Sequence, residues 1–119
     1  MPGTTPPAGR LFELRTYHVT PGKLEALKAR FRDHTLGIFA RLGLEVVAFF
    51  EQAPEGDQDE ELLVYLVAFA DRAHAERAWA AFRADPEWIA AKTETERDGS
   101  LTTKVDSLYL QPTEHSSLR

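Results

Sequence analysis

Three side chains that can do chemistry follow one another at alternate positions near the start of the chain. Glu13, Arg15 and Tyr17 lie in Leu11 to Val19, which has the pattern of a strand and ends at the turn Thr20 to Gly22. Because side chains alternate between the two faces of a strand, these three leave the same face. They could orient an anionic substrate group or donate a phenol hydrogen bond. The alternative is a structural ion pair between Glu13 and Arg15 at a dimer contact, which would add little net stability.

A histidine and several aromatic residues complete the candidate site. His34 falls at the edge of an apolar helical stripe, where it could act as a general acid or base near neutral pH. The alternative is a histidine at the margin of the core that bonds a backbone carbonyl. In the catalytic hypothesis Arg15 and Tyr17 stabilise developing oxyanion charge, while Glu13 holds Arg15. The predicted substrate-binding residues, with simple core packing as their alternative, are Tyr65, Phe31, Trp79 and Trp88.

Composition argues against several classes of function. A chain of 119 residues with 43% hydrophobic content is the size of one domain with a single core. The net charge is -5 and the basic residues are scattered among acids, so neither nucleic acid nor a membrane surface is an expected partner. The histidines have no metal-ligand spacing and no Gly-rich phosphate loop is present, so we expect no metal and no cofactor. The absence of cysteine and of an apolar leader favours a cytoplasmic setting.

The elements that must position these residues follow from the periodicity of the apolar side chains. Residues 1–10 have the composition of a flexible leader, residues 11–111 form a single domain, and residues 112–119 form a tail. A helix is predicted from Leu24 to near Gly43, with Thr20 as its N-cap and Pro21 at its first position. Asp71 and Asp85 are predicted to cap two further helical segments. The predicted strands are 11–19, 44–53, 62–70 and 102–110.

This order predicts an α+β fold of the ferredoxin-like βαββαβ type, a four-stranded antiparallel sheet with the helices on one face. Strand 44–53 offers Val46, Ala48 and Phe50 on one side and Val47 and Phe49 on the other, and strand 62–70 is apolar on both sides. A sheet covered by helices on one face only should alternate with polar residues. We therefore expect a second copy of the sheet as the other cover, in a homodimer with a twofold axis.

Several short strings, taken in order, resemble the NIPSNAP family within the wider dimeric α/β-barrel superfamily. They are Phe12 to Tyr17 (FELRTY), Pro21 to Leu24 (PGKL), His34, and Asp85 to Trp88 (DPEW). The resemblance covers roughly residues 11–110 and implies the dimeric, ferredoxin-like α/β barrel. The superfamily contains cofactor-free monooxygenases, isomerases and cyclases as well as haem-binding and stress-response proteins, so the resemblance raises the expectation of several activities without choosing one.

Two functions of different classes follow from these observations. The first is a dimeric protein that binds a hydrophobic small molecule and acts as a cofactor-independent monooxygenase, isomerase or cyclase through a His/Arg/Tyr pocket. The second is a non-catalytic dimeric binding or scaffold protein in which the same residues hold the sheet and the dimer together. A ligand-sized cavity that contains His34 would favour the first function, and a filled interior would favour the second.

Overall fold

The computed structural model describes residues 10–54 and 60–119, so the predicted leader lies outside the described residues except for its last position. The elements, in chain order, are β1 (Leu11–Val19), α1 (Leu24–Arg30), the π-helical turn η1 (Phe31–Thr35), α2 (Leu36–Leu42), β2 (Glu45–Glu51), β3 (Leu62–Phe69), α3 (Arg72–Ala84), α4 (Pro86–Thr95) and β4 (Thr102–Leu110).

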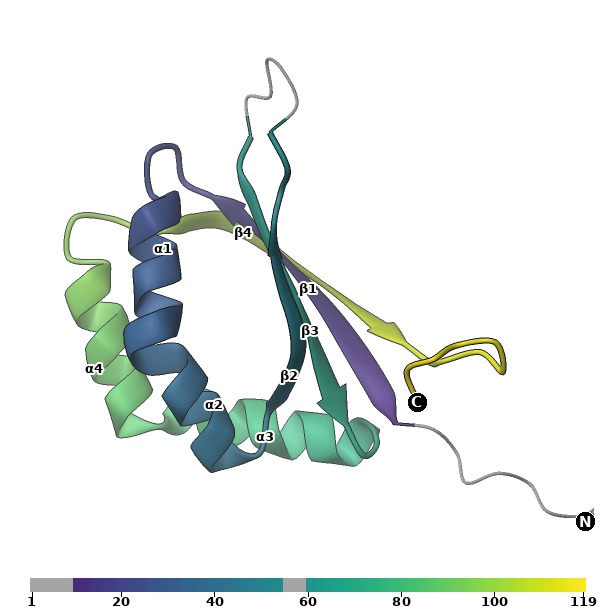
Figure 1. The fold of residues 1–119 in the computed structure, drawn as a ribbon. Helices are drawn as coiled ribbons and strands as arrows, with labels where there is room; N and C mark the ends of the chain where they lie inside the picture. The colour runs from purple at the N-terminus through teal and green to yellow at the C-terminus, as the bar shows by residue number, and fades with distance from the viewer. Residues whose placement is uncertain (1–9, 55–59) are drawn as a thin grey trace, which may run out of the picture.

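The four strands form one antiparallel sheet in the order β2-β3-β1-β4, and the helices cover one of its faces (Figure 1). The two central strands are therefore the first and the third in sequence, which is the ferredoxin-like arrangement predicted above. In the register of the central pair Arg15 lies opposite Tyr65, and on the other side of β1 Arg15 lies opposite Ser107. The candidate strand thus occupies the middle of the sheet.

The first helical segment runs without a break from α1 through η1 to α2, and it ends at Gly43 with a left-handed φ of 82°, as predicted. Within it, the π turn is closed by a bond from the Leu36 amide to the Phe31 carbonyl. The prediction that Thr20 caps this helix, with Pro21 at its first position, is wrong, because the helix begins at Leu24. Lys23 is the N-cap, and the Thr20 hydroxyl instead donates to the Ser100 carbonyl at 2.8 Å.

The predicted caps of α3 and α4 are confirmed. The Asp71 carboxylate accepts a hydrogen bond from the His74 amide, and the Asp85 carboxylate accepts one from the Trp88 amide. Pro86 occupies the first position of α4, where its missing N–H costs nothing. Asp85 also accepts a bond from Arg41 at 2.8 Å, which ties the start of α4 to the end of α2.

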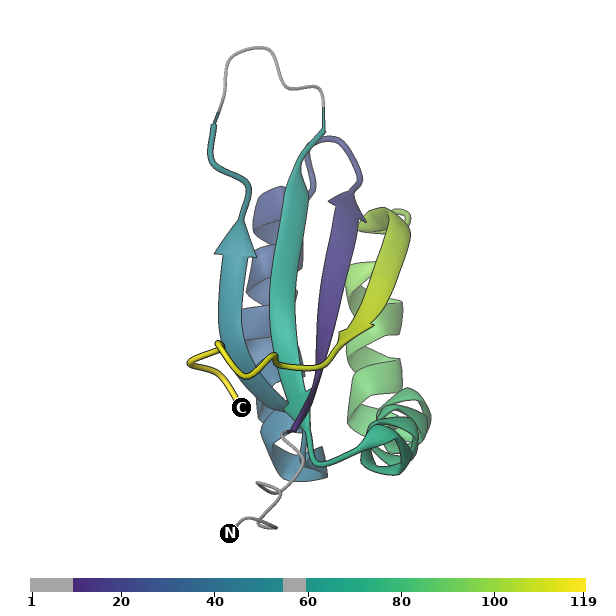
Figure 2. The ribbon, with the colours of Figure 1, turned by 90° about the vertical axis from the view of Figure 1, so that its right-hand side faces the viewer.

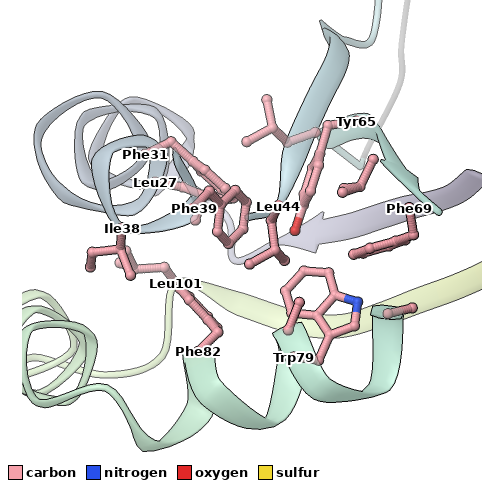
Figure 3. Close-up of a cluster of buried hydrophobic side chains, with 14 of the residues drawn as sticks. Leu27, Phe31, Ile38, Phe39, Leu44, Tyr65, Phe69, Trp79, Phe82 and Leu101 are labelled. Carbon is pink, nitrogen blue, oxygen red and sulfur yellow. The ribbon is translucent and has the colours of Figure 1, made fainter. Parts of the chain in front are cut away.

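The core lies between the sheet and the helices and is rich in aromatic side chains (Figure 3). Phe39 of α2 lies 5.6 Å from the Trp79 ring and 5.0 Å from the Phe82 ring, both on α3. Phe49 of β2 stacks on Tyr65 of β3 with centroids 5.0 Å apart. Pairs of this kind contribute roughly 0.5–1.5 kcal/mol beyond the burial of their area. These contacts hold the helices over β3, the strand in which Tyr65 lies opposite Arg15.

The face of the sheet away from the helices is only partly covered (Figure 2). The C-terminal residues after β4 fold back near it, where Pro112 and Leu118 approach Phe12 and Leu66, and the Arg119 carbonyl accepts a bond from Arg10. Elsewhere, large apolar side chains of this face stay in contact with water. Among the described residues, no helix is long and apolar enough to cross a membrane.

Candidate functional site

The side chains of Glu13, Arg15 and Tyr17 all face the helices. The candidate site therefore lies on the core side of the sheet and not on its open face. The Trp79 indole donates to the Glu13 carboxylate at 2.6 Å, and the Arg15 guanidinium donates to the Tyr65 hydroxyl at 3.0 Å. The hydroxyls of Tyr17 and Tyr65 lie 2.9 Å apart. The three side chains therefore lie on the face of the sheet that the helices cover.

Glu13 is a buried carboxylate that accepts several hydrogen bonds. It is 2% exposed and accepts bonds from Arg15 at 3.1 Å, from Trp79, and from the Ser107 hydroxyl of β4. A buried charge is tolerated when it is paired and hydrogen-bonded in this way. Glu13 thus anchors Arg15 from β1, Trp79 from α3 and Ser107 from β4 around one point.

Arg15 and Tyr65 each keep one protonation state at neutral pH. Burial raises the pKa of Tyr65 well above its ordinary value, and Tyr17 adds to the rise, so Tyr65 is a neutral phenol at neutral pH. Burial lowers the pKa of Arg15, but Tyr65, Tyr17 and Glu13 together outweigh burial and the pKa lies above its ordinary value. Arg15 therefore stays cationic, and its guanidinium also lies over the Trp79 ring at 4.2 Å.

A cavity of about 250 Å³ opens beside this network, between β1, β4 and the helices. Four of the predicted site residues line it, namely Arg15, Tyr17, Trp79 and Trp88, and Phe82 stands between the two tryptophans. Its volume is slightly below the roughly 300 Å³ at which ordinary ligand pockets begin. The space therefore suits a small organic molecule. The remaining lining residues are Arg30, Arg83, Lys92, Glu96, Ser100, Thr102 and Val105.

The other predicted site residues lie near this cavity without lining it. Glu13 and Tyr65 stand behind Arg15, and Phe31 packs its ring 5.6 Å from Tyr17. His34 lies half-buried in η1 and is not among the residues that line the cavity, and its imidazole makes no hydrogen bond to another described residue. The structure thus brings together the Arg/Tyr/Trp part of the candidate site and places His34 outside it.

Four charged residues of the cavity were not expected from the sequence: Arg30, Arg83, Lys92 and Glu96. A signal for them was present in their spacing. Arg83 follows Trp79 by four positions and Lys92 follows Trp88 by four positions, so each shares a helix face with a predicted tryptophan. Arg30 follows Leu27 by three positions and so belongs to the buried stripe of the first helix.

His18 lies on the opposite face of β1 from Arg15, as its position in the strand predicts. Its Nδ1 is 2.9 Å from the Glu60 carboxylate, and its Nε2 is 2.8 Å from the Asp106 carboxylate. These hydrogen bonds, to Asp106 first and then to Glu60, raise the pKa of His18 above its ordinary value of 6.5. The arrangement ties β4 to the segment before β3 on the open face.

Comparison with solved structures places the fold among small bacterial proteins. One similar structure is a NIPSNAP family protein with unknown function from Agrobacterium tumefaciens, with a TM-score of 0.79, 24% identity, and coverage of 94% of this chain and 96% of that one. An uncharacterised NIPSNAP domain protein from Burkholderia xenovorans has a TM-score of 0.73 and 24% identity, over 89% of this chain and 97% of that one. A search of curated proteins finds no match.

The fold likeness extends to a putative antibiotic biosynthesis monooxygenase from Bacillus cereus, with a TM-score of 0.52 and 16% identity over 92% of this chain and 98% of that one. At this identity the likeness concerns the fold alone. The family comparison is more specific, because the NIPSNAP family model matches residues 12–117, nearly all of the described domain. The chain belongs to the NIPSNAP family.

Proposed function

We propose that this protein is a homodimer that binds a small, largely hydrophobic organic molecule in the cavity beside Arg15, with the cytoplasm as its expected compartment. The observation that carries the proposal is the convergence of Arg15, Tyr17, Trp79 and Trp88 on one space. Apolar walls with a few fixed polar groups are the usual make-up of a ligand site. A scaffold protein with a filled interior would have no reason to keep this space open.

The open face of the sheet supports the homodimer. Phe50 and Leu108 are 55% and 57% exposed there, and Leu14, Val64 and Leu66 beside them are only half-buried. A contiguous apolar patch of this kind usually marks a contact with another molecule. A second copy of the same face offers a matching apolar surface, and a twofold axis would pair the two sheets.

The site also supports an enzymatic form of the proposal, a cofactor-independent oxygenase, isomerase or cyclase. Arg15 and Tyr17 border a space with aromatic walls, and the Tyr65 hydroxyl behind them is within hydrogen-bond distance of both and holds them in place. Fixed donors of this kind stabilise negative charge that develops on a substrate oxygen. The acid or base role of His34 stays a separate prediction, because His34 does not line the cavity.

The binding proposal is tested by native mass spectrometry on protein purified from its own host. We expect a small molecule to be retained, and its addition to stripped protein should change the tryptophan fluorescence, because both tryptophans of the chain line the cavity. The variant Val105→Phe fills the cavity from β4 and should lose the molecule. Ile89→Phe, at a 51% exposed position of α4 outside the cavity, should retain it.

The same measurements can also contradict the binding proposal. A protein that retains no molecule, and whose tryptophan fluorescence no metabolite fraction changes, would favour the non-catalytic scaffold. Once a ligand is known, Arg15→Met tests catalysis, and we expect turnover to fall about a hundredfold or more if Arg15 stabilises an oxyanion. Undiminished turnover in His34→Ala would remove the catalytic role predicted for that histidine.

A further inference from the structure

The cavity carries more positive charge than the rest of the molecule would suggest. The chain has a net charge of -5, yet four basic side chains line the cavity and Glu96 is the acidic residue among the lining residues. The basic side chains come from four separate elements, with Arg15 on β1, Arg30 on α1, Arg83 on α3 and Lys92 on α4. A cavity with one sign of charge concentrates ligands of the opposite sign.

Only part of this positive charge is neutralised by the protein. Glu13 pairs with Arg15 at 3.1 Å from behind, and Glu96 pairs with Arg30 at 2.9 Å. Arg83 and Lys92 form no ion pair with any other residue that the structure describes, and both are exposed residues that line the cavity. The cavity therefore has two cationic groups to offer to a ligand.

Arg30 gives a second and independent indication. Its side chain is 5% exposed, and its Nε is buried without a hydrogen-bond partner among the described residues, while Nη1 donates to Thr95 and Glu96. A buried donor that lacks an acceptor costs roughly 1–3 kcal/mol. Burial of the Arg30 guanidinium at the wall of the cavity therefore costs free energy. A negatively charged ligand would offset this cost.

The rest of the wall is aromatic, and the guanidinium groups lie on it. Arg15 lies over the ring of Trp79 at 4.2 Å, and Arg30 lies over the ring of Trp88 at 5.0 Å. Phe82 bridges the two indoles, 5.8 Å from Trp79 and 4.5 Å from Trp88. A flat ring fits between such walls because offset and edge-to-face contacts are favourable.

We propose that the ligand of this cavity is a small aromatic carboxylate, with its ring among Trp79, Phe82 and Trp88 and its carboxylate on the side of Arg30, Arg83 and Lys92. This inference rests on the proposed ligand site and adds the chemical class of the ligand. The aromatic walls account for the apolar part of the molecule, and the unpaired cations account for its charge. The volume of about 250 Å³ restricts it to a ring system with short substituents.

The experiment compares naphthoate with naphthamide, two molecules of nearly the same shape that differ in charge, by ligand-observed NMR titration of the full chain. We expect naphthoate to bind about tenfold more tightly, as an interaction with a charged group allows. The preference should shrink as salt is added, because Arg83 and Lys92 are exposed.

Matched variants on α3 locate the effect. Arg83→Gln removes an exposed cation that lines the cavity, whereas Arg77→Gln removes an exposed cation of the same helix that does not. We expect the preference for naphthoate to fall severalfold in Arg83→Gln and to stay unchanged in Arg77→Gln. Arg30→Met should abolish the preference. If this buried change unfolds the protein, the comparison of Arg83→Gln with Arg77→Gln decides the question alone.

The outcomes separate the two proposals. If naphthamide binds as tightly as naphthoate in the cavity, the inference about charge is overturned while the ligand site stands. If both variants on α3 lower the preference equally, the charge acts through the general field of the protein and the assignment to this wall is overturned. If neither molecule binds and the tryptophan fluorescence does not respond, the inference falls, and the host-purified protein then decides whether the ligand site falls with it.

Discussion

At the scale of single residues, Glu13 organises the site. Its carboxylate meets donors from three elements in a place that water does not reach, so its charge is balanced locally by Arg15. Removing one member of a buried pair leaves the other charge uncompensated, and the loss is larger than the value of the pair itself. The site's stability and its charge therefore depend on the same carboxylate.

Replacing this carboxylate by an amide tests the point. Glu13→Gln keeps the shape but leaves Arg15 without a counterion, and we expect the free energy of unfolding to fall by about 3 kcal/mol. Urea denaturation measures the change. Glu25→Gln, whose side chain is 85% exposed on α1, is the control and should stay within about 0.5 kcal/mol of the parent. A loss below about 1 kcal/mol for Glu13→Gln would show that water or a rearranged partner replaces the pair.

His18 makes the folding stability of the protein depend on pH, and the direction of the change follows from the shift in its pKa. Because hydrogen bonds to Asp106 and Glu60 raise its pKa in the folded state, its stabilising effect is complete below the unfolded value near 6.5 and is lost as the pH rises through the folded pKa. The same contact lowers the pKa of Asp106, which therefore stays ionised across this window.

The expected outcome is a stability difference between the parent and His18→Gln that is larger at about pH 6 than at about pH 9. Chemical denaturation of both proteins at the two pH values measures it. A difference that is the same at both values would mean that the imidazole contributes only through its shape and not through its charge.

At the scale of elements, the caps of α3 and α4 could be predicted because capping is local chemistry within four residues. The predictions that were wrong concern residues whose contacts are made with distant segments of the chain. Thr20 gives its hydroxyl to Ser100 across the molecule and so does not cap α1. A bulge between Val46 and Ala48 also shifts β2, so that Val46 and Phe49 both pack on the core, which the strict alternation expected from the sequence does not allow.

Alanine substitution at Gly37 of α2 and at Gly43, its C-cap, is expected to change the free energy of unfolding in opposite directions. Gly43 has a left-handed φ of 82°, which a residue with a Cβ adopts only with strain, so Gly43→Ala should destabilise by about 1 kcal/mol or more. Gly37 lies inside the helix with open space around a new Cβ, so Gly37→Ala should stabilise by roughly 0.5–1 kcal/mol. Thermal unfolding of the two variants gives the comparison, and shifts of equal sign would contradict it.

At the scale of the whole molecule, the order of elements and the face of β1 determine much of the site. Alternation along β1 predicted that Glu13, Arg15 and Tyr17 act together, and the structure places them together. The cationic wall could not be predicted in the same way, because Arg30 and Lys92 come from separate helices whose approach is set by tertiary packing. Helical spacing indicates which residues share a face, but it does not show which faces meet.

The proposed homodimer has a direct test on the open face. Leu108→Glu puts a charge into the apolar patch, and we expect the variant to sediment as a monomer while the parent sediments as a dimer in analytical ultracentrifugation. Ile89→Glu changes an equally exposed side chain of α4 and should remain dimeric. A parent that is monomeric at every concentration would refute the homodimer.

The π turn in the first helix has a consequence for how this family can vary. A π turn holds one residue more than an α-helical turn, and each added residue rotates everything after it by about 100°. Arg30 precedes this extra residue and lines the cavity, whereas Phe39 follows it and packs on Phe82. Deleting the extra residue would turn one of these two side chains away from its place. A relative with a plain α-helix here is therefore expected to have exchanged either its buried arginine or its core aromatic residue.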